Sequence, residues 1–64
     1  MRVLVDNLVC VENGVNMRYV EISCDSSEQS NLPTEGIVDG SSALFTNNSK
    51  VLFFNEKTGS WIEA

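Results

Sequence analysis

Hydrophobic and polar residues alternate in two stretches near the start of the chain, Val3–Glu12 and Met17–Cys24. Both stretches are rich in β-branched side chains, which favour extended backbone. Between them stands Asn13-Gly14, a strong hairpin signal, because a type I′ turn needs positive φ at both central residues. The pattern therefore predicts a β-hairpin. A helix over most of the first stretch is the competing interpretation, but the valine content and the missing N-cap argue against it.

The period of two assigns the apolar residues of this hairpin to faces. Those that share one side are Val3, Val5, Val9 and Val11 in the first strand and Val20, Ile22 and Cys24 in the second. A two-residue loop and a four-residue loop both preserve this parity, so we expect the two sides to form one core face. The polar pair Asp6-Asn7 in mid-strand predicts a β-bulge or a local break.

Strand character disappears over residues 25–40, where Ser, Asn, Asp, Pro and Gly dominate. We expect a connecting loop of about 15 residues there, longer than most loops. Its apolar residues Leu32, Ile37 and Val38 are expected to anchor it against the domain. A loop of this length in a small domain is either functional or partly mobile.

Three short apolar segments follow, at residues 41–46, 50–55 and 60–64, and turn signals separate them. Gly59 suits the left-handed position of a G1-bulge hairpin, which brings Trp61 beside Phe53 or Phe54. The whole pattern predicts one all-β domain, residues 1–64, of about five strands. We expect the N-terminal hairpin and a C-terminal three-stranded meander to form a small antiparallel sheet or barrel-like roll. No helix longer than about two turns is expected.

Few residues are available for chemistry. The chain has no histidine, and its two cysteines, Cys10 and Cys24, lack the number and spacing of zinc ligands. Their strand parities differ, so we expect both to be reduced, unbridged, small buried hydrophobes. A disulfide and a reactive thiol are the alternatives. No nucleophile–base pair and no calcium-binding loop is evident, so we expect no enzymatic activity, no catalytic or cofactor-binding residue, and no metal.

The net charge is −5, from nine acidic and four basic residues that form no cluster. A phosphate-backbone binder needs several cations on one face, so we expect no direct nucleic-acid binding. No apolar run approaches the roughly 18 residues of a membrane span. The apolar N-terminus is interrupted at Asp6-Asn7 and carries no cleavage site, so we expect no signal peptide and synthesis in a cytoplasm.

Apolar residues are adjacent in Ala43–Phe45 and Val51–Phe54, which makes both faces of these segments apolar. The candidate residues for an interaction or core-sealing surface are Met17, Tyr19, Leu44, Phe45, Leu52, Phe53, Phe54 and Trp61. A compact roll with an ordinary surface is one interpretation, and a sheet with one face covered by another chain is the other. The small size favours the second, because a domain this short buries only about 60% of its unfolded surface.

In the C-terminal half, Leu32-Pro33 and Gly40-Ser41 precede a strand, and Phe53-Phe54, Gly59 and Trp61 follow in that order. This order resembles a pattern in small virion-associated proteins of tailed bacteriophages and prophages, although phenylalanine replaces the usual tyrosine in the aromatic strand. The resemblance implies a structural head or tail accessory or decoration protein. It implies other virion proteins or further copies of the chain as partners, and location in the virion. It transfers no catalytic residue.

Two other function classes remain open. One is a small acidic phage-encoded inhibitor of a host enzyme, an anti-defence protein or DNA mimic. Mimicry requires carboxylates along one ridge at phosphate-like spacing, which nine dispersed acids do not obviously provide. The other is a carbohydrate-binding module in which Trp61 and Tyr19 stack on sugar rings.

Overall fold

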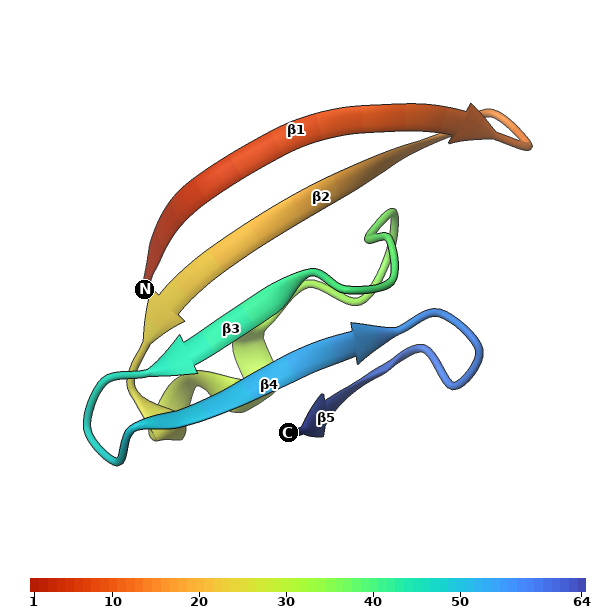
Figure 1. Cartoon of the computed structure of the whole chain (residues 1–64). Helices are drawn as coiled ribbons and strands as arrows, with labels where there is room; N and C mark the ends of the chain where they lie inside the picture. Colours follow the sequence, from red (N-terminus) through yellow and green to blue (C-terminus); the bar gives the residue numbers. More distant parts are fainter.

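A computed structural model, which describes residues 1–64, shows five strands in one open sheet, in the order β1-β2-β3-β4-β5 (Figure 1). The strands are β1 (Arg2–Glu12), β2 (Val15–Cys24), β3 (Ser42–Phe45), β4 (Lys50–Asn55) and β5 (Ser60–Glu63). A short 3-10 helix, η1 (Ser26–Asn31), lies between β2 and β3. The predicted all-β fold, with an N-terminal hairpin and a C-terminal meander, is confirmed. The sheet is mixed rather than antiparallel throughout, because β2 and β3 run parallel, and it does not close into a roll.

The crossover between β2 and β3 accounts for the parallel pair. A tight turn can join only antiparallel strands, so parallel strands need a connection that returns along the sheet. This connection begins with η1, whose N-terminus has a capping box. The Asp25 carboxylate accepts a hydrogen bond from the Ser27 N–H (2.9 Å), and the Glu28 carboxylate accepts one from the Asp25 N–H (3.1 Å). The predicted loop at residues 25–40 is therefore partly helical.

The second half of the crossover is tied to the middle of β2. The Arg18 N–H donates to the Gly36 carbonyl (2.8 Å), and the Val38 N–H donates to the Arg18 carbonyl (3.0 Å). Ile37 thereby forms a parallel bridge with Arg18, three residues before Glu21, where β3 begins to pair with β2.

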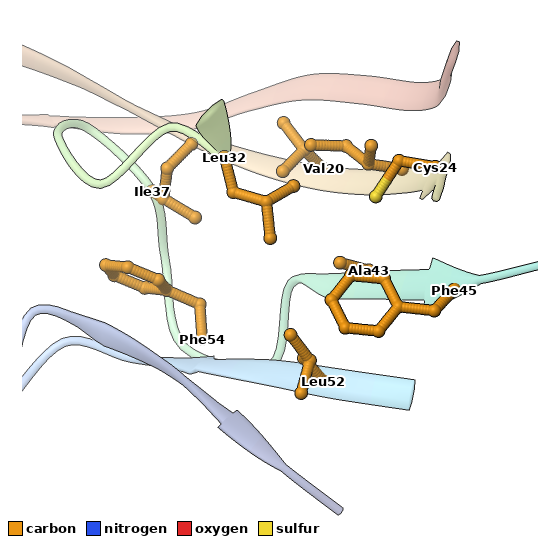
Figure 2. Packing of buried hydrophobic residues seen from close by; sticks show 9 residues of the cluster. Val20, Cys24, Leu32, Ile37, Ala43, Phe45, Leu52 and Phe54 are labelled. Carbon is orange, nitrogen blue, oxygen red and sulfur yellow. The ribbon is translucent and has the colours of Figure 1, made fainter. Parts of the chain in front are cut away.

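The core lies between the crossover and one face of the sheet, which we call the inner face and which carries Val20, Ala43 and Leu52 (Figure 2). The buried hydrophobic residues are Val20, Ile22 and Cys24 of β2, Ala43 and Phe45 of β3, Leu52 and Phe54 of β4, and Leu32 and Ile37 of the crossover. Two predictions are confirmed: the apolar side of β2 faces the core, and the crossover is anchored by its own apolar residues. Val38 is only half-buried.

Ser41 is the one fully buried polar side chain, with 0% of its surface exposed. Its hydroxyl accepts a hydrogen bond from the Val20 N–H (3.1 Å), and its carbonyl accepts one from the Phe54 N–H (2.9 Å). Because buried backbone N–H groups need partners, Ser41 joins the end of the crossover to β2 and β4 at once.

The first strand contributes almost nothing to the core, contrary to the prediction. In β1 only Val5 is half-buried, and every other residue is exposed. Two register shifts leave Leu4 and Val9 without partners in β2, and each shift breaks the period of two. Val3 and Val5, expected on one side, therefore lie on opposite faces. The predicted bulge at Asp6-Asn7 is wrong in position, because both residues pair regularly with β2.

Both predicted hairpin turns are confirmed. Asn13 and Gly14 have φ of 50° and 77° and connect β1 to β2 in two residues, as a type I′ turn requires. Gly59 has φ of 65°, and its N–H donates to the Asn55 carbonyl (2.8 Å). The β1–β2 hairpin is much longer than β3, and its tip projects past the rest of the sheet (Figure 1).

Candidate interaction surface

Four apolar side chains gather on the face of the sheet opposite the core, which we call the outer face. They are Leu44 of β3, Val51 and Phe53 of β4, and Ile62 of β5, and together we call them the outer patch. Leu44 pairs directly with Val51, and Phe53 pairs with Ile62. Leu44, Phe53 and Ile62 are 40%, 46% and 45% exposed. The patch is thus contiguous over three strands, and the crossover, which packs on the inner face, leaves it open.

Polar side chains border the outer patch on the β2 side. Ser42 is the cross-strand neighbour of Phe53, and Glu21 is the next neighbour along the same row. The Tyr19 hydroxyl donates a hydrogen bond to the Glu21 carboxylate (2.8 Å), and this bond raises the pKa of Tyr19. An apolar centre with a hydrogen-bonded polar edge is the usual composition of a protein interface.

The structure divides seven of the eight candidate residues into three groups, and the eighth, Trp61, packs against the core cluster. Phe45, Leu52 and Phe54 are buried in the core, and Leu44 and Phe53 belong to the outer patch. Met17 and Tyr19 are half-buried in β2, with Met17 paired to Cys10 near the hairpin tip. The alternation of side chains along each strand causes this division, because adjacent apolar residues must point to opposite faces.

Two members of the outer patch, Val51 and Ile62, were not among the sequence candidates. Val51 is two residues before Phe53, so the period of two already places it on the same face. Ile62 is the cross-strand partner of Phe53, and the register set by the Gly59 turn is the signal from which this neighbour could have been found.

Trp61 seals the core rather than joining the outer patch. Its ring packs edge-to-face on Phe54, with ring centroids 5.2 Å apart and an interplanar angle of 66°. The indole Nε1–H donates a hydrogen bond to the Pro33 carbonyl (2.9 Å). The side chain is half-buried and packs against the core cluster. It therefore fastens β5 both to β4 and to the crossover.

Most acidic side chains have local partners. Seven of the nine form a hydrogen bond or an ion pair within the chain, and these are Asp6, Glu21, Asp25, Glu28, Asp39, Glu56 and Glu63. The Ser27 N–H lowers the pKa of Asp25. The Asp25 N–H and the chain's amino terminus lower that of Glu28. The carboxylates thus hold turns, η1 and strand pairs, and no cluster of three or more His, Cys, Asp or Glu is arranged to hold a metal ion.

The two cysteines are free and lie on opposite faces, as predicted. Cys24 is buried in the core, and burial raises the pKa of its thiol, which opposes the thiolate form that reacts. Cys10 is exposed on β1. The prediction that both are buried is therefore wrong for Cys10, because β1 lies at the edge of the sheet.

No helix in the structure has both the length and the apolar character needed to cross a membrane. Comparison with known proteins yields no further assignment: no family model, no curated protein and no solved structure matches the chain.

Proposed function

We propose that this chain is a non-enzymatic structural protein whose outer patch binds a neighbouring protein in an assembly. The observation that carries the proposal is the patch itself: a contiguous group of apolar side chains on three strands, uncovered, on the face opposite the core. Burying apolar surface stabilises a complex by about 25 cal/mol per Å². Contiguous exposed apolar patches on small soluble domains mark sites of protein or ligand binding.

The chemistry of the patch favours a protein partner over a sugar. A sugar-binding platform needs an exposed aromatic ring with hydrogen-bonding groups around it, whereas Trp61 already packs on Phe54 and bonds to Pro33. The outer patch is three aliphatic residues and one phenylalanine on a sheet surface. Such a surface matches the apolar core of a protein–protein interface.

The assembly we propose is a virion, with the chain as a head or tail accessory or decoration protein. Support comes from the resemblance of residues 32–61 to small proteins of tailed phages, and from an architecture whose exposed apolar residues lie on sheet surfaces. The seven acids with local partners leave an acidic DNA mimic less well supported.

The test compares Phe53→Ser with wild type in gradient-purified virus particles from the host that produces the protein. Phe53 contributes to no core contact, so we expect the variant to keep the wild-type far-UV circular dichroism but to be lost from the particles. Val15→Ser is the matched control, because Val15 is a similarly exposed strand residue outside the patch (48% exposed). Particles that contain no wild-type chain, or as much Phe53→Ser as wild type, would overturn the proposal.

A further inference from the structure

The free edge of β1 is a second unpartnered surface, distinct from the outer patch. β1 has 11 residues and lies at one end of the sheet, so one side of its backbone has no strand beside it (Figure 1). Its exposed apolar residues are Val3, Leu4, Leu8, Val9 and Val11, each 54–59% exposed. The strand contains no lysine and no proline, the residues that usually protect an edge. The opposite edge, β5, is only four residues long.

In the β1 sequence RVLVDNLVCVE, the charged ends and the valines are arranged nearly symmetrically about Asn7. When two identical strands pair antiparallel across a two-fold axis, each residue faces the residue equally far on the other side of the axis. An axis at Asn7 gives the pairs Arg2 with Glu12, Val3 with Val11, and Val5 with Val9. Opposite charges therefore meet at both ends, and valine meets valine between them.

In three of the five residue pairs across this axis, neither residue is a bulged one, and both members lie on the same face of β1. Cross-strand neighbours must lie on the same face, and the pairing with β2 fixes the faces of β1. The inner-face residues of β1 are Val3, Asp6, Leu8 and Val11, and the outer-face residues include Arg2, Asn7 and Glu12. Inversion about Asn7 exchanges position 3 with 11, 6 with 8, and 2 with 12, so each of these residues keeps its face.

The one charge near the middle of the strand is already neutralised within its own chain. Asp6 forms an ion pair with Arg18 of β2, with 2.6 Å between the carboxylate oxygen and Nε. An inward-pointing, unpaired charge would protect the edge from association. This paired charge does not, so the edge stays open to a second strand.

We propose that two copies of the chain associate through β1, antiparallel and centred on Asn7, to form one continuous ten-stranded sheet. The symmetric sequence and the end-to-end charge complementarity favour a second copy over an unrelated strand. The axis is perpendicular to the sheet, so both outer patches lie on the same face of the dimer. The dimer does not depend on the proposed function, because the outer patch takes no part in the β1 edge.

The first experiment places a cysteine on the axis. Asn7→Cys is made in a Cys10→Ser background, which leaves only the buried Cys24 as another thiol. Directly opposed residues of antiparallel strands have Cα atoms about 4.5–5.5 Å apart, within the range that a disulfide bridges. Mild oxidation should give a covalent dimer of twice the 7.1 kDa chain mass on a non-reducing gel.

Glu12→Cys in the same background is the matched control. It is exposed on the same outer face of β1, but in the proposed register it faces Arg2 of the second copy. We expect at least about tenfold less covalent dimer than for Asn7→Cys, because the two introduced thiols lie at opposite ends of the strand pair. Equal cross-linking of both variants, or preferential cross-linking of Glu12→Cys, would overturn the register.

The second experiment reverses charges and measures the dimer by sedimentation equilibrium at low salt. Arg2→Glu places two carboxylates together at each end and should raise the dimer dissociation constant about tenfold, given the modest strength of exposed ion pairs. Arg2→Glu/Glu12→Arg should restore the wild-type dissociation constant, which would not happen if Arg2 had a purely structural role.

A wild-type chain that stays at 7.1 kDa at several hundred micromolar would overturn the dimer. Cross-linking of Asn7→Cys only to a different protein would do the same. Phe53→Ser should leave the dimer intact, so failure here is distinguishable from failure of the proposed function.

Discussion

Replacing Trp61 with alanine tests how the last strand is held. The substitution removes an edge-to-face contact with Phe54 and a hydrogen bond to the Pro33 carbonyl. An aromatic pair contributes about 0.5–1.5 kcal/mol, and a hydrogen bond contributes about the same. A fully buried Trp→Ala change costs about 3–5 kcal/mol. Because Trp61 is only half-buried, we expect a loss of about 2–3 kcal/mol.

This loss is large relative to the total free energy of unfolding of the domain. At about 0.05–0.15 kcal/mol per residue, a chain of 64 residues has a free energy of unfolding of roughly 3–10 kcal/mol. Urea unfolding followed by far-UV circular dichroism measures the change without needing the tryptophan signal. Every variant is compared at one protein concentration, because self-association makes apparent stability depend on concentration.

Two further variants separate the contributions. Trp61→Phe keeps an aromatic ring against Phe54 and loses the indole N–H, so we expect a smaller cost, about 1 kcal/mol. Ile62→Ala, the neighbouring position on the outer face, is the control and should cost less than Trp61→Ala. A free energy of unfolding for Trp61→Ala within about 0.5 kcal/mol of wild type would refute the core-sealing role, because surface substitutions fall in that range. Fluorescence of a fully water-exposed indole in the wild-type chain would refute it too.

Three other outcomes follow from the fold and are measured by the same urea titration. Ser41→Ala should cost about 1–3 kcal/mol, because it leaves the buried Val20 N–H without an acceptor; no loss would refute the role of its hydroxyl. Gly36→Ala should cost more than Gly40→Ala, since both have positive φ but only at Gly36 does an added Cβ meet the Asn16 carbonyl, at 2.7 Å; equal costs would contradict the close approach. Accepted N–H bonds lower the pKa of both capping-box carboxylates of η1, so their stabilisation is complete above their ordinary pKa values of 3.8 and 4.5 and is lost as the pH falls below them. The urea midpoint should therefore drop more between about pH 5 and pH 3 in wild type than in the Asp25→Asn/Glu28→Gln variant. Equal drops in the two proteins would contradict this role of the two carboxylates.

The features that sequence predicted correctly are those that local sterics decide. Asn13-Gly14 and Gly59 adopt the positive φ that their turns need, and few other residues do so without strain. The alternation in β2 is regular, so Val20 and Ile22 could be assigned to the core from spacing alone. The division of Leu44 and Phe53 from their buried neighbours follows the same rule.

The features that sequence missed depend on contacts between distant segments. The composition of residues 25–40 indicates a connecting segment but does not indicate where that segment packs on the sheet. Leu32 and Ile37 pack over the inner face, and the connection therefore returns along the sheet and places β3 parallel to β2. The bulges at Leu4 and Val9 are set by the register with β2. The bulge was predicted at the wrong position because Asp6 is polar, whereas its side chain forms an ion pair with Arg18 and does not break the strand.

The outer patch can be examined directly by hydroxyl-radical footprinting of Phe53 in the free chain and in gradient-purified virus particles. Phe53 is 46% exposed in the isolated chain and should be labelled readily there. If a neighbouring virion protein covers the patch, labelling of Phe53 should fall at least several-fold in the particles, while Val15, outside the patch, keeps its labelling. Equal labelling of Phe53 in both samples would contradict the proposed interface, and particles that lack the chain would contradict the proposed assembly.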